Sequence, residues 1–245
     1  MSDKTLNFET IIPKFDAILS RGLCSGVGDR EGQMCIGAAI CAAMDLPYYR
    51  YNPSCVEPVE PVIRSYNIDL NDKKWTSPKA RAKGLRNLGI AQIGSNGVVD
   101  GHEFAKRLAK RTIQVLLPEM LRSIPRLADA RLLELAKVCE QEGTFQAAIK
   151  LRNALAGFTY DAADAADPAC TAYAAASCTA HAADACTGAV SAASAAVGAA
   201  AWAAAADATT PKTDKYLLLS ASLALEVLRE LKSPGCEWID WVVTK

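Results

Sequence analysis

The sequence predicts an all-α protein, and three observations support this fold class. Apolar residues recur at helical spacing through the first 140 residues and near the C-terminus, with capping residues where helices should begin. No series of alternating strands separated by turns is present. Alanine, the residue with the highest helix propensity, supplies 28 of the 55 residues from 154 to 208. We therefore expect a mixed helical domain over 1–125 and a close-packed, alanine-rich helical bundle over 126–245.

The first half should contain five helices, each with a recognisable start or end. The expected ranges are 7–20, 31–44, 77–92, 101–117 and 126–141. Thr76 or Ser77 is the expected N-cap of the third helix, and Pro78 suits its first turn because proline has no N–H to leave unpaired. Asp100 and Glu103 have the spacing of a capping box at the start of the fourth helix, and Pro118 should limit that helix.

Two further segments follow from the apolar pattern. Residues 31–44 are apolar almost all round, which indicates a buried central helix. A proline-bearing section follows it, in which a short helix or strand around 62–68 is an open alternative.

The alanine-rich tract from 167 to 208 should be helical, with a break near Gly188 or Gly198. Small side chains let helices approach closely, so we expect a tight antiparallel bundle. Residues 213–232 should form an amphipathic helix that packs on it. Its predicted core face comprises Leu217, Leu218, Leu219, Leu223, Leu225, Val227, Leu228 and Leu231.

Composition excludes several classes of function. Lys+Arg and Asp+Glu are both 27, so bulk charge would hold the chain neither to nucleic acid nor to a membrane. The uncharged run 188–206 is long enough to span a bilayer, but alanine gives too little insertion free energy. The nine cysteines, with no apparent export signal at the start, predict reduced thiols and a cytoplasmic location.

Residues suited to catalysis or metal binding are few. Cys178 and His181, with Asp184 or Cys170, could ligate zinc, but no CxxC pair accompanies them, so we expect no metal and no cofactor. A cysteine nucleophile would need a base within hydrogen-bond reach, and none is evident in the sequence. We therefore favour a protein that is not an enzyme.

The most specific prediction of a functional site is an anion-binding site. The loop containing Gly26, Gly28 and Gly32 lacks the ending of a P-loop, but it enters a predicted helix whose N-terminal N–H groups could bind an anion. The site would be completed by Lys106 and Arg107 from a positively charged helix face. The polar pair Asn71-Asp72, with Trp75 nearby, would add further contacts. The predicted ligand-binding residues are Arg21, Cys24, Asp29, Arg30, Asn71, Asp72, Trp75, Lys106 and Arg107. The structural alternatives are a turn at Asn71-Asp72 and a solvated basic helix face.

Two resemblances bear on origin. The run Arg21-Gly22-Leu23-Cys24-Ser25-Gly26, then Asp29, Gly32, Cys35-Ile36-Gly37-Ala38 and Asn71-Asp72, resembles a small uncharacterised helical domain of bacteria and phages. This resemblance covers about residues 10–115, and Leu23 stands where that family has tryptophan. The alanine-rich tract is similar to putative immunity proteins of bacterial toxin systems. These resemblances imply a helical protein used in conflict between bacteria and phages, and neither implies an active site.

The predicted function is a non-enzymatic binding protein that neutralises a protein partner or sequesters a small anionic, nucleotide-like ligand. It would bind neither a membrane nor a specific nucleic-acid sequence, and a homo-oligomer is compatible with the pattern. Two alternatives stay open. The first is an enzyme with Cys24 or Cys35 as nucleophile, and the second is a self-assembling structural protein.

Overall fold

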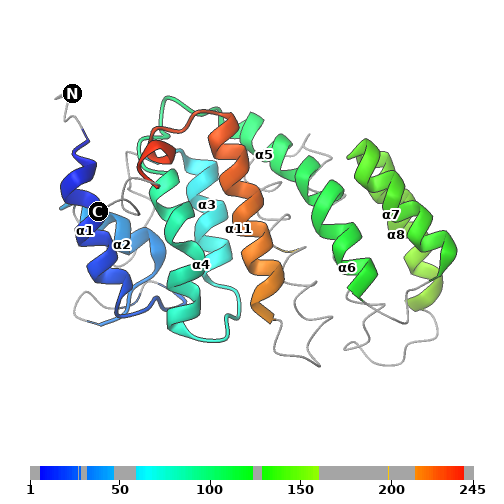
Figure 1. The fold of residues 1–245 in the computed structure, drawn as a ribbon, viewed down its shortest axis with the longest axis horizontal. Coiled ribbons are helices and arrows are strands. Elements are labelled where there is room, and N and C mark those ends of the chain that lie inside the picture. The colour runs from blue at the N-terminus through cyan, green and yellow to red at the C-terminus, as the bar shows by residue number, and fades with distance from the viewer. Residues whose placement is uncertain are drawn as a thin grey trace. The chain divides into compact units, whose positions relative to one another are not determined.

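The computed structural model confirms the all-α fold class: every regular element among the described residues is a helix (Figure 1). The described residues are 6–26, 28, 32–46, 59–123, 129–159, 198 and 213–239. The helices are α1 (Phe8–Leu19), α2 (Ile36–Ala43), α3 (Pro61–Asn71), α4 (Pro78–Ala91), α5 (Gly101–Arg111), α6 (Leu117–Ser123), α7 (Ala130–Glu142), α8 (Phe145–Thr159) and α11 (Thr213–Glu230), with a π-helical turn η1 (Thr112–Leu116) and a 3-10 turn η4 (Pro234–Trp238).

The chain packs into two compact units. Unit 1 comprises Met1–Gly101 together with Leu225–Lys245, and unit 2 comprises His102–Ala224. Within the predicted alanine-rich bundle, the tract from 167 to 208 lies outside the described residues except for residue 198. The division into domains at residue 125 therefore stays a prediction.

Helix starts in unit 1 follow local capping chemistry. The side chain of Asn7 accepts a hydrogen bond from the Thr10 N–H at the start of α1. Ser77 caps α4 through the Ala80 N–H at 3.0 Å, and Pro78 is the first residue of that helix, as the sequence predicts. Glu60 caps α3 through two backbone N–H groups. The segment left open between helix and strand is therefore a helix.

The start of α2 differs from the predicted start at residue 31. Cys35 is the N-cap, with extended backbone, and its Sγ accepts the Ala38 N–H at 3.4 Å. Before it, Met34 pairs with Leu23 in an isolated parallel bridge. A strand-like pairing therefore occupies the place of the first predicted turn, and α2 is buried on nearly every side.

The predicted end of a helix at Pro118 is wrong, because the chain stays helical through η1 and α6 to Ser123. Proline has no N–H, and its ring clashes with the carbonyl four residues earlier in an α-helix. The wider π turn lies immediately before this position and relieves that clash. Pro118 is consequently the second residue of α6, and it is buried.

In unit 2, α7 starts and ends with recognisable caps. The Asp129 carboxylate accepts two backbone N–H groups at the start. Gly143 ends the helix in the left-handed conformation at φ 59°. The helix α8, which the sequence analysis did not predict, follows directly and contributes Leu151 and Leu155 to the core.

The C-terminal part of the described chain completes unit 1. Ser233 donates its hydroxyl to the Ala91 carbonyl, which α4 leaves without a helical partner. The rings of Phe8 and Trp238 stack with centroids 4.9 Å apart. The core of unit 1 thus joins residues from both ends of the described chain.

Candidate functional site

Seven of the predicted anion-binding residues lie in unit 1, and the structure describes five of these and joins several of them. Asn71 is fully buried at the end of α3. Its Nδ2 donates to the Cys24 carbonyl at 2.9 Å, and its Oδ1 accepts the Ile36 N–H at 3.2 Å. The carboxamide therefore connects the glycine-bearing loop to the first turn of α2.

Asp72 provides the loop with an anion from the chain itself. Its Oδ1 accepts the Gly26 backbone N–H at 2.8 Å and the Asn71 Nδ2 at 2.9 Å. The Ser25 hydroxyl donates to the same oxygen at 3.4 Å. Backbone N–H groups that were predicted to bind a ligand therefore donate hydrogen bonds to side chains of the protein itself. The acceptors are Asp72 at the loop, and Cys35 and Asn71 at the start of α2.

Trp75 and Arg21 also take part in internal contacts. The Trp75 indole is only 6% exposed, and its Nε1 donates to the Leu70 carbonyl at 3.0 Å, so its ring packs in the core. The Arg21 carbonyl accepts the Gln33 side chain at 3.0 Å. Sequence reasoning missed Arg81, a buried arginine that donates to the Leu23 carbonyl at 2.8 Å.

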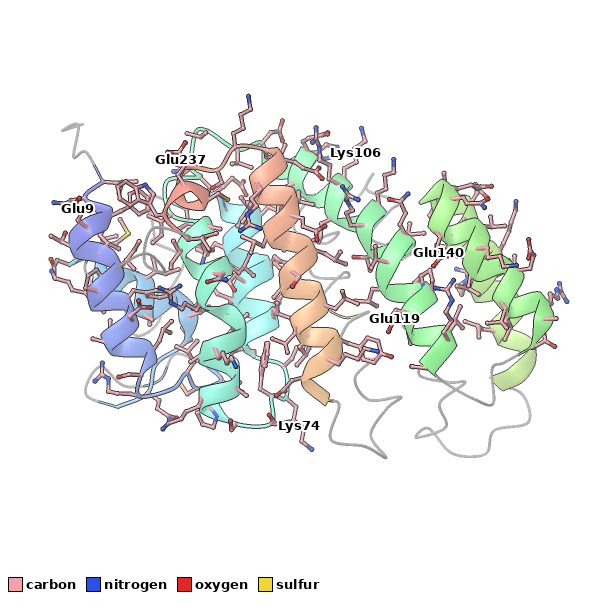
Figure 2. All side chains as sticks on the ribbon, in the orientation of Figure 1. Glu9, Lys74, Lys106, Glu119, Glu140 and Glu237 are labelled. Atoms are coloured by element: carbon pink, nitrogen blue, oxygen red, sulfur yellow. The ribbon has the colours of Figure 1, made fainter. Side chains whose placement is uncertain are left out.

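The other predicted binding residues are placed differently. Asp29 and Arg30 lie outside the described residues. Lys106 and Arg107 belong to unit 2, where both pair with Glu103, at 3.8 and 2.8 Å, which offsets part of their charge. Lys106 lies on α5 (Figure 2). Ligand binding by the nine residues stays a prediction.

The two candidate nucleophiles have thiols that hold their protons. Burial raises the pKa of the Cys24 thiol, and the larger burial of Cys35 raises the pKa of that thiol too. The Cys24 Sγ donates to the Gln33 carbonyl at 3.4 Å. A raised pKa lowers the thiolate fraction at neutral pH, so this environment opposes the cysteine-enzyme alternative.

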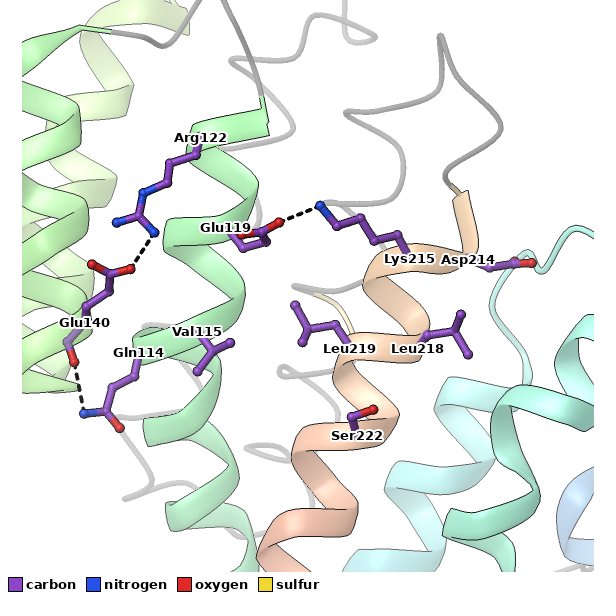
Figure 3. Close-up of a pocket in the computed structure, with 10 residues that line it drawn as sticks. All are labelled: Gln114, Val115, Glu119, Arg122, Glu140, Asp214, Lys215, Leu218, Leu219 and Ser222. Atoms are coloured by element: carbon purple, nitrogen blue, oxygen red, sulfur yellow. Dashed lines mark hydrogen bonds and ion pairs between the residues drawn. The ribbon is translucent and has the colours of Figure 1, made fainter.

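A groove in unit 2 was not predicted from the sequence. It is a hollow of about 780 Å³ between α11 on one side and η1 with α6 on the other (Figure 3). Its lining includes Gln114, Val115, Glu119, Arg122, Glu140, Asp214, Lys215, Leu218, Leu219 and Ser222. We call this hollow the α6–α11 groove.

The apolar side chains of the groove are incompletely covered. Leu218 is 43% exposed, although the sequence placed it on the core face of its helix, and that prediction is wrong. Its neighbour Leu217 is buried, as are Leu223 and Val227. The core stripe of α11 is therefore narrower than predicted, and Leu218, Leu219 and Val115 all line the hollow. Leu219 points toward Val115, and Leu218 lies on the other side of α11 (Figure 3).

Two ion pairs involve side chains that line the groove. Lys215 on α11 lies 2.5 Å from Glu119 on α6, and Arg122 on α6 lies 2.5 Å from Glu140 on α7. The guanidinium of Arg122 lowers the pKa of Glu140. Gln114 donates to the Glu140 carbonyl at 3.2 Å. Glu119 and Lys215 therefore join α6 to α11, whereas Arg122 and Gln114 both bond Glu140, on the side of α6 away from α11 (Figure 3).

The groove is lined by apolar, charged, amide and hydroxyl side chains. Among its described lining residues there is neither a cysteine nor a histidine, and the one hydroxyl belongs to Ser222. The sequence did not predict the α6–α11 groove, because its apolar residues have the same spacing as core residues. Its existence depends on the placement of α11 beside η1 and α6, which a sequence pattern does not give.

Comparison with known proteins places this chain in no family: no family model matches it, and neither do curated proteins or solved structures. In the described part of the chain, no three His, Cys, Asp or Glu side chains cluster closely enough to hold a metal ion. No helix in the same part has both the length and the apolar character that crossing a bilayer requires.

Proposed function

We propose that this protein is a non-enzymatic binding protein that neutralises a partner protein by holding one of its helical segments in the α6–α11 groove. The observation that carries this proposal is Leu218, an apolar side chain 43% exposed inside a hollow that also contains Leu219 and Val115. Exposed apolar surface within a concave site is typical of a binding site.

The dimensions and walls of the groove support a helical occupant. Its volume of about 780 Å³ lies within the range of pockets that hold ligands or anchor side chains. Two helices form its sides, and a groove between helices accepts the apolar face of an amphipathic helix. Apolar residues of the partner would lie against Leu218 and Leu219, and polar residues against the charged side chains of the lining.

Charge favours a protein partner over a small anion. The lining contains three acidic residues, Glu119, Glu140 and Asp214, and two basic residues. Both bases already pair with acids, Lys215 with Glu119 and Arg122 with Glu140. A partner segment with one or more basic residues beside its apolar face would suit this balance.

Selection from a peptide library tests the proposal directly. Peptides displayed on phage would be panned on the full chain, and the selected peptides would then be tested for binding to Leu218→Glu, which places a charge in the groove. Val98→Glu is the matched control, because Val98 is 58% exposed and belongs to unit 1. We expect peptides with apolar residues at helical spacing and basic flanks, which bind wild type and Val98→Glu but not Leu218→Glu.

Two results would contradict binding in the groove. If selected peptides bind Leu218→Glu as tightly as wild type, the groove is not the binding site. Titration with inorganic phosphate and with ATP tests the small-anion function. Heat of binding that disappears in Arg21→Glu would favour that function over the groove.

The class of partner follows from the resemblances given above. If the chain serves in bacterial or phage conflict, the neutralised protein would be a toxin or a defence protein in the cytoplasm. Sedimentation over a wide concentration range tests the self-assembly alternative, which requires large species to grow with concentration.

A further inference from the structure

Two cysteines of unit 1 are brought side by side by the pairing of two short segments. Leu23 and Met34 form a parallel bridge, and the Cys24 N–H donates to the Met34 carbonyl at 3.2 Å. The residues that follow each bridge partner are Cys24 and Cys35. Paired strands lie about 4.7–4.9 Å apart, and successive side chains alternate in direction, so the two thiols project on the same side.

This spacing suits a disulfide. Bridged cysteines have Cα atoms about 4.4–6.8 Å apart, a range that contains the spacing of paired strands. Both cysteines are free thiols, and Cys24 is the more accessible, because it is half-buried while Cys35 is 2% exposed. Asn71 holds the two segments in register, since it bonds both the Cys24 carbonyl and the Ile36 N–H.

We propose that Cys24 and Cys35 form a reversible disulfide when the protein meets a small-molecule disulfide of the oxidised-glutathione class. The Cys24 thiolate attacks one sulfur of the oxidant, which forms a mixed disulfide and releases one glutathione thiolate. Cys35 then loses its proton and attacks the Cys24 sulfur, which releases the second glutathione. The protein gives up two electrons and two protons, and the oxidant becomes two thiols.

The environment of the thiols sets the rate of this exchange. Burial raises the pKa of both thiols, so the thiolate fraction at neutral pH is small. Below the thiol pKa, that fraction increases about tenfold for each unit of pH. The exchange should therefore be slow at pH 7 and become steadily faster as the pH rises.

The bond would change the start of α2. At present the Cys35 Sγ accepts the Ala38 N–H, and the Cys24 Sγ donates to the Gln33 carbonyl. Oxidation removes the Cys24 donor and fixes the loop segment covalently to the helix cap. The pair is thus a site of oxidative modification that is independent of the α6–α11 groove and of its proposed partner.

Peptide mapping tests the proposal on the full chain. The reduced protein would be incubated with oxidised glutathione at pH 7 and pH 8.5, quenched in acid, alkylated and digested with trypsin. Cleavage after Arg21, Arg30 and Arg50 separates the Cys24 peptide from the peptide that holds Cys35 and Cys41. We expect a cross-linked pair that forms more than tenfold faster at the higher pH, and fragmentation should place the bond at Cys35.

Variants distinguish the pair from its neighbours. Cys41→Ala is the matched control and should keep the cross-link, because Cys41 is a buried thiol on the same tryptic peptide. Cys24→Ala should abolish the cross-link. Cys35→Ser keeps a capping oxygen and should trap glutathione on Cys24. If wild type also holds glutathione on Cys24 without a cross-link, or if Cys24 pairs with another cysteine, the proposal is wrong.

Phenylarsine oxide provides an independent measure of proximity in the reduced protein. It binds two neighbouring thiols and releases water, without any oxidation of the protein. One equivalent should protect Cys24 and Cys35 together from alkylation, and Cys24→Ala should remove that protection. Protection of neither thiol in wild type would show that the two sulfurs do not meet.

Discussion

The carboxylate of Asp72 accepts the backbone N–H of Gly26 at 2.8 Å. This single contact places a negative charge where the loop would otherwise present an N–H group to an anionic ligand. Asn71, the preceding residue, connects the same loop to α2. The Asn-Asp pair therefore acts as a structural clamp between α3, the loop and the start of α2.

Asn71→Ala should destabilise the fold by about 2–3 kcal/mol. The substitution leaves the buried Ile36 N–H and Cys24 carbonyl without their partners, and each unmet buried group has a desolvation cost. Urea denaturation measures the change. Asn87→Ala is the control, because Asn87 is exposed and its side chain bonds only the neighbouring Arg86 among the described contacts. Equal midpoints for the two variants would contradict the clamp.

Gly143→Ala should destabilise the protein more than Gly97→Ala does. Both glycines have positive φ, at 59° and 75°, so an alanine at either position costs about 1 kcal/mol in backbone strain. A Cβ at residue 143 would also lie 2.6 Å from the Gln114 Cγ, whereas nothing lies within 4 Å of the one at residue 97. We expect a further loss of roughly 1–3 kcal/mol at Gly143, measured by thermal unfolding.

The Arg122–Glu140 ion pair should contribute stability that acid removes. Arg122 lowers the pKa of Glu140 in the folded protein. Its contribution is therefore complete above the usual glutamate pKa of about 4.3 and disappears as the pH falls through the lower folded value. Because both side chains are more than one third exposed, the contribution is at most about 1 kcal/mol.

The difference in unfolding free energy between wild type and Glu140→Gln measures that contribution at pH 7 and pH 3. The difference should be present at pH 7 and smaller at pH 3. Glu134→Gln removes a more exposed pair with Lys137 and serves as control. A difference that grows on acidification would show that the sign is wrong.

Cys139 should be protected from alkylation in the folded protein. Burial raises the pKa of the Cys139 thiol to about 12, so almost none is thiolate at pH 8. Iodoacetamide reacts with the thiolate, and mass spectrometry of tryptic peptides reports which cysteines are modified. Modification of Cys139 should require urea. Labelling of native Cys139 at the rate of the unfolded chain would place this thiol at the surface.

Local chemistry made part of the fold predictable. Ser77 and Pro78 mark the start of α4 in the sequence, and the structure begins the helix there, because capping depends on residues a few positions apart. The start of α2 was misplaced, since it depends on Cys35 and on a bridge to Leu23. The predicted helix end at Pro118 was wrong for a related reason, because the π turn in the preceding residues accommodates the proline within the helical segment.

The candidate site was less predictable than the helices. Asn71 and Asp72 were singled out together with the loop that they contact, but a sequence does not tell whether such polar groups bind a ligand or one another. Leu218 has the spacing of a core residue and nevertheless lies 43% exposed in a groove. Which leucines of α11 are covered depends on partner helices far away in the sequence.

The order of synthesis on the ribosome gives unit 1 an unusual constraint. Its helices α1 to α4 emerge early, yet Ala91 receives its hydrogen bond from Ser233 and Phe8 its ring partner from Trp238. The 123 residues of unit 2 are synthesised in between, which takes roughly 6–25 s. During that interval the nascent N-terminal helices expose surfaces that their late C-terminal partners will cover. A truncated message that stops before Ser233 would produce a chain in which that exposure is permanent, and such a chain should be a ready substrate for chaperones and proteases.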